Sequence, residues 1–256
     1  MKPEAKRKIN VRDVVIGAKK KLICVPVVAK DTSELLQQSE WVLRSGPDLI
    51  EWRADAFILP SEIESAAIEL RKVIKNIPIV FTLRHSEEGG INLLPQAKRA
   101  EIISNVLNDR TVDILDLEVE HSGDIINLLK ESKNAYAKLI LSHHDFEKTP
   151  SEEEMLQKML QAEKLGADIA KIAVMTNNYE DVLRVLGTSL KAKQVLEIPT
   201  IIISMGKYGF ASRIAGGYFG SDIIFASGST SSAPGQLEIS ELQEIIRIID
   251  KNYIRN

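Results

Sequence analysis

The sequence predicts a single α/β domain with the (β/α)8 architecture, the TIM barrel, over its 256 residues. A chain of about 250 residues is the usual size of one such barrel. Eight short segments rich in β-branched residues alternate with longer segments of helical periodicity, which is the pattern of parallel strands joined by helices. These segments begin roughly 30 residues apart, so each interval has room for one helix of three or four turns.

The eight predicted strands belong to one domain, because no interdomain linker interrupts the alternation of strands and helices. In chain order they are residues 22–28, 48–53, 78–84, 112–118, 137–143, 168–175, 200–204 and 222–226. Ahead of them, residues 9–16 and a turn at Gly17 predict an extra strand or a hairpin that closes the lower end of the barrel. The expected organisation is therefore one domain, residues 1–256, made of an extension (residues 1–21) and the barrel (residues 22–256).

Helix boundaries are marked by capping residues and by glycines. Thr32 or Ser33, and Ser61, are expected to cap helices, and another helix is expected to start after Thr149-Pro150-Ser151, where three glutamates follow the serine. Leucine-rich helical spacing runs through residues 155–165 and 179–190. Helix ends are expected near Gly46, Gly166 and Gly187.

Composition and charge exclude several classes of protein. With 44% hydrophobic and 27% charged residues, the chain is neither collagen-like nor disordered. A net charge of −3 without a basic stripe argues against nucleic-acid binding. Purely apolar runs are far shorter than the ~20 residues that a membrane helix needs. The single cysteine, Cys24, allows neither an intrachain disulfide nor a cysteine-held zinc ion, and with no signal-peptide pattern it favours a cytoplasmic location.

Polar side chains gather where the predicted strands end, which is where (β/α)8 barrels carry their chemistry. They include Glu51, Arg53, Arg84, Asp116, Glu118, His143, His144, Lys171 and Ser204. A single charge at a strand end is usually solvated or caps a helix, but here the ends of seven strands converge. The sequence therefore predicts a functional site at the carboxyl ends of the strands.

Lys171 lies within an apolar predicted strand, where both faces of a parallel barrel are covered. A buried lysine needs a partner or must lose its charge, because removing an ammonium ion from water costs several kcal/mol. One interpretation is an ion pair with a carboxylate such as Glu118. The other is a desolvated, neutral amine that attacks a carbonyl substrate.

Two adjacent histidines, His143 and His144, are candidates for general acid–base catalysis near neutral pH. Successive side chains of a strand point to opposite faces, so one of the two faces the interior, and the spacing does not say which. The acidic segment of residues 84–90 contains Glu88 and offers a carboxylate that could orient a histidine. Acidic loops are also commonly only solvated.

The loop of residues 228–236 is small and rich in hydroxyl groups. Its backbone N–H groups could bind a phosphate, or it could be a mobile lid whose Ser232 and Gln236 bind a polyol. It could equally be a plain connection to the last helix. Its composition alone leaves all three interpretations open.

Six segments, taken in order, carry a recognisable pattern. They are Glu51-Trp52-Arg53, Phe81-Thr82-Leu83-Arg84 with Glu88-Gly89-Gly90, Ser142-His143-His144-Asp145-Phe146, Lys171-Ile172-Ala173-Val174-Met175, Ser212-Arg213-Ile214-Ala215-Gly216 and Ser232-Ala233-Pro234-Gly235-Gln236. From about Leu22 to the C-terminus the chain thereby resembles type I 3-dehydroquinate dehydratase, a family of the shikimate pathway. Two positions depart from the family: His143 stands where a small polar residue such as Asn is common, and Pro26 where some members have serine.

The resemblance implies conversion of 3-dehydroquinate to 3-dehydroshikimate and water, by syn elimination through a lysine Schiff base. Lys171 would attack the C3 ketone, His144 would be the general acid and base, and Glu88 would hold the imidazole in the useful tautomer. Arg213 would bind the substrate carboxylate. The other substrate-binding residues would be Glu51, Arg53, Arg84, Met205, Ser232 and Gln236. The resemblance implies no metal or organic cofactor, and it suggests a homodimer.

Two other functions remain open at this point. Another Schiff-base enzyme, of the class I aldolase type, would also use a lysine on the sixth strand and would act on phosphorylated substrates. Arg213, with Glu51 and Arg53, favours a carboxylated polyol ring instead. A non-catalytic binding barrel would be expected to have lost Lys171 or His144, and both are present.

Overall fold

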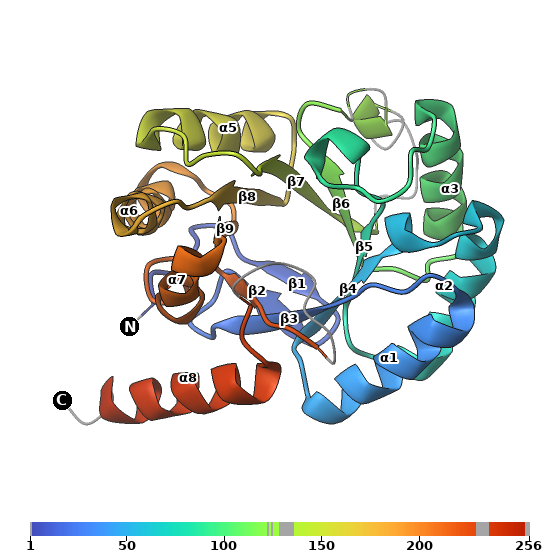
Figure 1. Ribbon diagram of the computed structural model, residues 1–256, viewed down its shortest axis with the longest axis horizontal. Helices are drawn as coiled ribbons and strands as arrows, with labels where there is room; N and C mark the ends of the chain where they lie inside the picture. Colours follow the sequence, from blue (N-terminus) through green and yellow to red (C-terminus); the bar gives the residue numbers. More distant parts are fainter. Residues whose placement is uncertain (1, 122, 124, 128–135, 229–235, 254–256) are drawn as a thin grey trace.

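Eight parallel strands form a barrel in the computed structural model, which describes residues 2–121, 123, 125–127, 136–228 and 236–253 (Figure 1). The strands are β3 (Leu22–Val27), β4 (Leu49–Arg53), β5 (Ile79–Thr82), β6 (Ile114–Glu118), β7 (Lys138–Asp145), β8 (Ile169–Met175), β9 (Thr200–Met205) and β10 (Ile223–Phe225). From β3 to β9 each strand pairs with the next one along the chain, and β10 pairs with β3. The predicted fold class is confirmed, and all eight predicted strands are present.

The barrel is nearly closed, with a seam between β9 and β10. The described residues of these two strands form no ladder, but the backbone N–H of Asp222 donates to the carbonyl oxygen of Thr200 at 2.7 Å. The side-chain hydroxyl of Ser221 accepts the backbone N–H of Ile202 at 3.2 Å. These bonds hold the last strand beside the seventh, so that the carboxyl ends of all eight strands meet at one end of the barrel.

Helices surround the strands on the outside (Figure 1). They are α1 (Thr32–Ser45), α2 (Ile63–Ile74), α3 (Gln96–Asn108), α5 (Glu152–Lys164), α6 (Tyr179–Val195), α7 (Phe210–Ala215) and α8 (Ile239–Tyr253). Between helices and strands lies the larger apolar core, in which the buried Trp52 ring contacts Phe57 and Phe81 edge to face. Within the described residues, no helix is both long enough and apolar enough to span a membrane.

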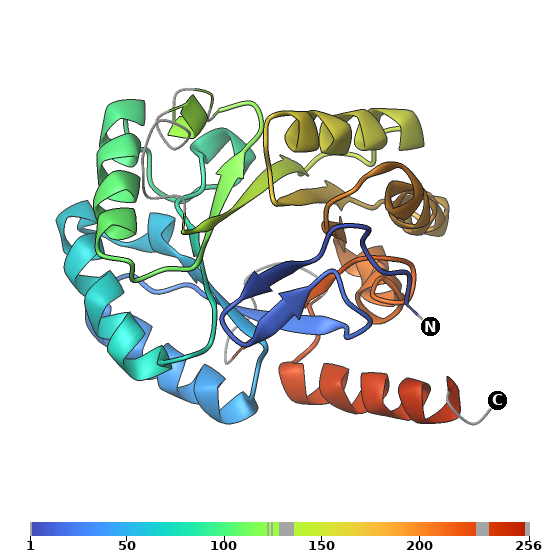
Figure 2. The ribbon, with the colours of Figure 1, turned by 180° about the vertical axis from the view of Figure 1, so that it is seen from behind.

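A two-stranded antiparallel hairpin precedes the barrel, as predicted. Its strands are β1 (Ile9–Val11) and β2 (Val14–Ile16). Gly17 follows at a φ of 92°, a backbone conformation that is strained for residues with a side chain. The apolar residues of the hairpin pack against side chains from the amino ends of the barrel strands, such as Leu22 and Ile169. The hairpin thus covers the amino-terminal end of the barrel (Figure 2), opposite the carboxyl ends of the strands.

Three of the predicted helix boundaries are confirmed. Ser151 caps α5 in a capping box with Glu154, so the side chain of each residue accepts the other's backbone N–H. Gly46 ends α1 in the left-handed conformation, at a φ of 67°, and its N–H donates to the carbonyl of Leu43. Gly166 follows the last residues of α5 at a φ of 99°.

Three other boundary predictions are wrong. The N-cap of α1 is Asp31, one residue ahead of the predicted Thr32 or Ser33, because its carboxylate accepts the N–H of Glu34. Ser61 lies inside a 3-10 turn that leads into α2 and makes no side-chain cap there. Gly187 lies within α6. A glycine inside a helix costs only about 1 kcal/mol relative to alanine, so the packing of α6 outweighs it.

Candidate active site

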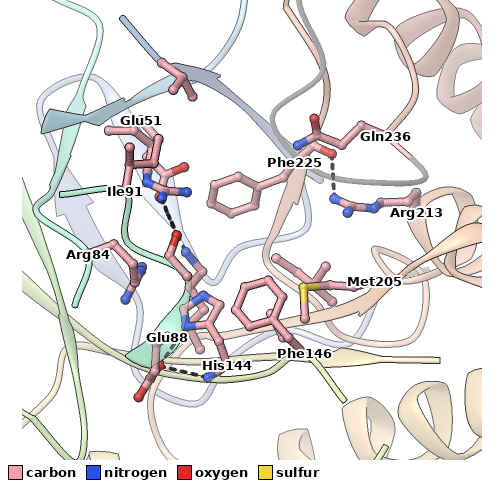
Figure 3. Close-up of a pocket in the computed structure, with 16 residues that line it drawn as sticks. Glu51, Arg84, Glu88, Ile91, His144, Phe146, Met205, Arg213, Phe225 and Gln236 are labelled. Atoms are coloured by element: carbon pink, nitrogen blue, oxygen red, sulfur yellow. Dashed lines mark hydrogen bonds and ion pairs between the residues drawn. The ribbon is translucent and has the colours of Figure 1, made fainter. Parts of the chain in front are cut away.

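A cavity of about 420 Å³ opens at the carboxyl ends of the strands (Figure 3). The predicted site residues among its lining are Glu51, Arg53, Arg84, Glu88, His144, Lys171, Met205, Arg213 and Gln236. Ser232, the remaining predicted site residue, lies outside the described residues, as does most of the loop 228–236. The structure therefore brings together every predicted site residue that it describes.

Lys171 reaches the cavity from the middle of β8 and is only 5% exposed. Its Nζ lies 2.7 Å from Asp116 Oδ2 and 3.5 Å from Glu51 Oε1. The Phe225 ring lies beneath the ammonium group, 4.7 Å from Nζ to the ring centroid. The lysine is paired, but its partners are Asp116 and Glu51, whereas the sequence suggested Glu118.

Glu118 instead belongs to a buried network around Arg84. Arg84 Nη1 donates to Glu118 Oε1 at 2.8 Å, and Arg84 Nη2 lies 3.0 Å from Asp116 Oδ1. Arg99 of α3 donates to the second oxygen of Glu118 at 2.7 Å. Burial alone would raise the pKa of Asp116, but the charges of Arg84 and Lys171 lower it to about 2. Asp116 is therefore a carboxylate, held between two cations.

His144 and Glu88 form the second polar group of the cavity (Figure 3). Glu88 Oε2 lies 2.9 Å from His144 Nδ1 and accepts the backbone N–H of His144 at 2.9 Å. Burial raises the pKa of Glu88 to about 7. Burial, together with the positive charges of Arg84 and Lys171, lowers the pKa of His144 well below its ordinary value. His144 is therefore neutral at neutral pH and able to accept a proton.

The two adjacent histidines point to opposite sides of β7, as strand alternation requires. β7 extends to Asp145, two residues beyond the predicted end, so both histidines lie within the strand. His144 lines the cavity. His143 lies outside it, with Nδ1 3.2 Å from Glu120 Oε2. The structure thus settles which of the two histidines faces the site.

Arg213 is carried by the short helix α7 and is 4% exposed. Its Nη1 donates to the carbonyl oxygen of Phe225 at 3.2 Å (Figure 3), and its Nε has no hydrogen-bond partner among the described residues. Burial lowers the pKa of Arg213 to about 10, and no carboxylate in the described part of the chain forms an ion pair with it. Arg53, by contrast, is held by both oxygens of Asp55, at 2.8 and 2.9 Å.

Sequence reasoning left Asp116 and Phe225 out of the predicted site. The sequence does contain a signal for Asp116, because positions 116 and 118 of one strand share a face and Glu118 is itself a candidate partner of Lys171. Nothing in the sequence singles out Phe225, whose ring lies under the lysine because β10 and β8 flank β9 and both residues point into the barrel.

A buried lysine and a neutral histidine at the carboxyl end of a (β/α)8 barrel define the chain as a barrel enzyme. Residues 23–253 match the family model described as type I 3-dehydroquinase. The chain therefore belongs to the type I 3-dehydroquinase family, whose members are hydro-lyases. This membership excludes the aldolase-type and the non-catalytic alternatives.

Individual relatives agree with the family model. A 3-dehydroquinate dehydratase of Geobacillus sp. (strain WCH70) is 40% identical over 248 residues, which cover 95% of this chain and 96% of the relative. The crystal structure of 3-dehydroquinate dehydratase from Geobacillus kaustophilus HTA426 has a TM-score of 0.93 at 38% identity, covering 96% of this chain and 98% of that one. A type I enzyme from Clostridium difficile has a TM-score of 0.90 at 33% identity, with the same coverage.

Proposed function

We propose that this enzyme dehydrates 3-dehydroquinate to 3-dehydroshikimate through a Schiff base on Lys171, with His144 as the general acid and base. The observation that carries the proposal is the placement of Lys171, buried in the cavity between two carboxylates and sharing that cavity with a neutral histidine. An amine in such a cavity can attack a ketone and form an imine.

Lys171 must lose a proton before its amine can attack. Asp116 cannot take that proton, because its pKa is held at about 2. His144 is the suitable acceptor, because it is neutral and lines the same cavity. The amine then adds to the C3 carbonyl, and loss of water leaves a positively charged iminium ion. Asp116 and Glu51 stabilise that positive charge at Nζ as they stabilise the ammonium ion before it.

The iminium ion withdraws electrons from C2, which makes the C2 hydrogen acidic enough for a mild base. His144 removes this proton, and the electron pair of the C–H bond forms a C2–C3 double bond, which turns the iminium ion into a neutral enamine. The nitrogen then returns its electron pair, so the C2–C3 pair moves to form the C1–C2 double bond and the iminium ion is restored. The C1 hydroxyl group leaves as water, taking a proton from His144 on the same face of the ring, which makes the elimination syn. Hydrolysis of the iminium ion then releases the product and restores Lys171, so one water molecule is eliminated overall.

Glu88 acts on His144 rather than on the substrate. When ionised, its carboxylate accepts the proton on Nδ1 and leaves Nε2 as the basic nitrogen. The same oxygen also accepts the backbone N–H of His144, which fixes the ring relative to its strand. Glu88 is therefore assigned a positioning role.

Arg213 is the group assigned to the substrate carboxylate. A guanidinium group buried without an acidic partner among the described residues favours an anion beside it, and its planar fork suits a carboxylate. Glu51, Arg53, Arg84, Met205 and Gln236 would contact the ring and its hydroxyls. The corresponding role of Ser232 stays a prediction from the sequence. Every step uses side chains of the chain itself, so the proposal requires no metal or organic cofactor.

Borohydride trapping tests the proposal. Reduction in the presence of 3-dehydroquinate should fix one substrate-derived adduct per chain on the peptide that contains Lys171, as mapped by mass spectrometry. Omission of the substrate and the variant Lys171→Met are the matched controls, and neither should be labelled. Labelling of a different lysine, or turnover by Lys171→Met, would refute the Schiff-base assignment. The crystal structure of the related Clostridium difficile enzyme is one with covalent modified comenic acid, which supports covalent chemistry in the family.

The homodimeric state and the cytoplasmic location are further proposals. The first rests on the family relation and the second on the single buried cysteine, Cys24. Sedimentation of the purified protein tests the first proposal, and fractionation of the source cells tests the second.

A further inference from the structure

All four histidines of the chain lie at the carboxyl end of the barrel, although the proposed reaction uses only one of them. His85 follows β5, His121 follows β6, and His143 adjoins His144 on β7. The rings of His85 and His121 are parallel, with centroids 4.2 Å apart. This grouping places two imidazoles beside Glu88, and neither has a role in the proposed reaction.

The donor atoms of His85, Glu87 and His121 lie within 4.8 Å of one another. Nε2 of His121 is 3.6 Å from Glu87 Oε2 and 3.8 Å from Glu88 Oε1. Both imidazoles are partly exposed and Glu87 is exposed, so an ion in solution can reach the group. Two imidazoles and a carboxylate form a donor set that zinc prefers and that magnesium and calcium do not.

A second observation points to the same place. Glu88 is only 4% exposed, and its Oε1 is buried without a hydrogen-bond partner among the described residues. Its other oxygen holds His144. A buried oxygen without a partner is costly, and this one lies beside the imidazole of His121. A cation bound by the two histidines would supply the missing partner.

We propose that His85, Glu87 and His121 bind a zinc ion, with Glu88 Oε1 as the fourth ligand, and that the bound ion inhibits the enzyme by drawing Glu88 away from His144. The inhibition rests on the proposed function of Glu88 and His144, whereas the binding does not. Because the ion takes no part in the reaction, its removal restores activity.

The described geometry allows this coordination after a modest movement. Zinc holds imidazole nitrogens and carboxylate oxygens at about 2.0–2.2 Å in a tetrahedron, so its ligand atoms lie about 3.4 Å apart. The donors of His85, Glu87 and His121 must therefore approach one another by roughly 1 Å, which rotation of the exposed Glu87 and of the two rings can supply. Glu88 is not in this group, and its Oε1, 3.8 Å from His121 Nε2, must move toward the other three donors. Two contacts are given up: the one between Glu88 Oε2 and His144 Nδ1, at 2.9 Å, and a long hydrogen bond, 3.3 Å, from the backbone N–H of Glu87 to His85 Nδ1.

Zinc binding is measured first, by titrating Zn²⁺ into the metal-free protein in competition with a chromogenic chelator. One ion per chain is expected. His121→Ala and His85→Ala should each weaken binding by more than about tenfold. His143→Ala is the matched control and should bind like the wild type. Loss of binding in His143→Ala alone would place the ion on Glu120 and His143, and unchanged binding in His121→Ala would also overturn the proposal.

Inhibition is measured second, from initial rates of enone formation from 3-dehydroquinate. Zinc should inhibit the wild type, EDTA should reverse the inhibition, and His121→Ala should keep its basal rate and resist zinc. Equal inhibition of both proteins would overturn the proposal. Binding at His121 without inhibition would refute the coupling through Glu88 and His144 but leave the ion site standing. Failure of borohydride trapping would refute the proposed Schiff-base reaction but would not bear on zinc binding.

Discussion

Replacing Lys171 by methionine should destabilise the fold as well as abolish activity. Methionine has nearly the shape of lysine without its charge, so the variant removes the ammonium ion and creates little cavity. Asp116 and Glu51 would then lose the cation that lies 2.7 and 3.5 Å from their oxygens. Both carboxylates are buried, and an uncompensated buried charge is strongly destabilising.

The size of the effect follows from these distances. At an effective dielectric constant of about 20, a pair at 2.7 Å is worth about 6 kcal/mol and one at 3.5 Å about 5 kcal/mol before desolvation. The variant also avoids the desolvation cost of burying an ammonium ion, which offsets several kcal/mol of the lost Coulomb energy. Asp116 keeps Arg84 and Ser142 as partners, and Glu51 keeps the hydroxyl of Thr82. The free energy of unfolding should therefore fall by about 3–5 kcal/mol, and the Tm by about 10 °C.

Urea denaturation followed by tryptophan fluorescence measures this change. Trp52, next to Glu51 on β4, is a buried probe. A double-mutant cycle with Asp116→Asn should give a coupling energy of about 1–3 kcal/mol between Lys171 and Asp116. If Lys171→Met is as stable as the wild type, or if the coupling is zero, the buried ion pair does not contribute as the distances indicate.

Two further predictions concern the histidine and its carboxylate. His144→Ala should lower kcat by about 10²- to 10⁴-fold, while His143→Ala, outside the cavity, should lower it far less. Steady-state assays of both variants measure this difference, and equal losses would contradict the assignment of His144 as the general acid and base. Burial raises the pKa of Glu88 from 4.5 to about 7, so its contribution to stability is fully present below pH 4.5 and is lost as the pH rises through 7. Glu88→Gln should flatten this part of the curve of unfolding free energy against pH, and a curve that parallels the wild type would show that Glu88 does not titrate there.

The strands and the hairpin could be predicted because their signals are local. Each strand is a short β-branched run, and the period of two fixes which side chains share a face once the strand is placed. The strand that carries Lys171 shows this well, since its apolar neighbours alone indicated burial. Helix caps were less predictable, because Asp31, Thr32 and Ser33 can all cap a helix and only the hydrogen bond to Glu34 decides among them.

The partners of Lys171 could not be predicted, because they depend on how strands far apart in the chain face one another. Asp116 and Glu118 are equivalent in the sequence, both inward on β6. Arg99 lies on a helix outside the barrel and forms an ion pair with Glu118. Arg84 pairs with the other oxygen of the same carboxylate. Asp116 contacts Arg84 through one oxygen and pairs with Lys171 through the other. A contact from an outer helix therefore decides an ion pair in the centre of the site, which no pattern within β6 records.

Arg84 connects the two halves of the proposed mechanism. Its charge lowers the pKa of Asp116, which keeps a carboxylate beside the lysine nitrogen. Burial, and after it the charge of Arg84, lowers the pKa of His144, which keeps the imidazole neutral. A site with the carboxylate but without a neutral imidazole would hold the lysine charged with no base to accept its proton. A site with only the imidazole would have a base but no carboxylate to stabilise the iminium ion. One buried arginine, fixed by Glu118, thus favours the deprotonated form of both groups, a carboxylate at Asp116 and a neutral imidazole at His144.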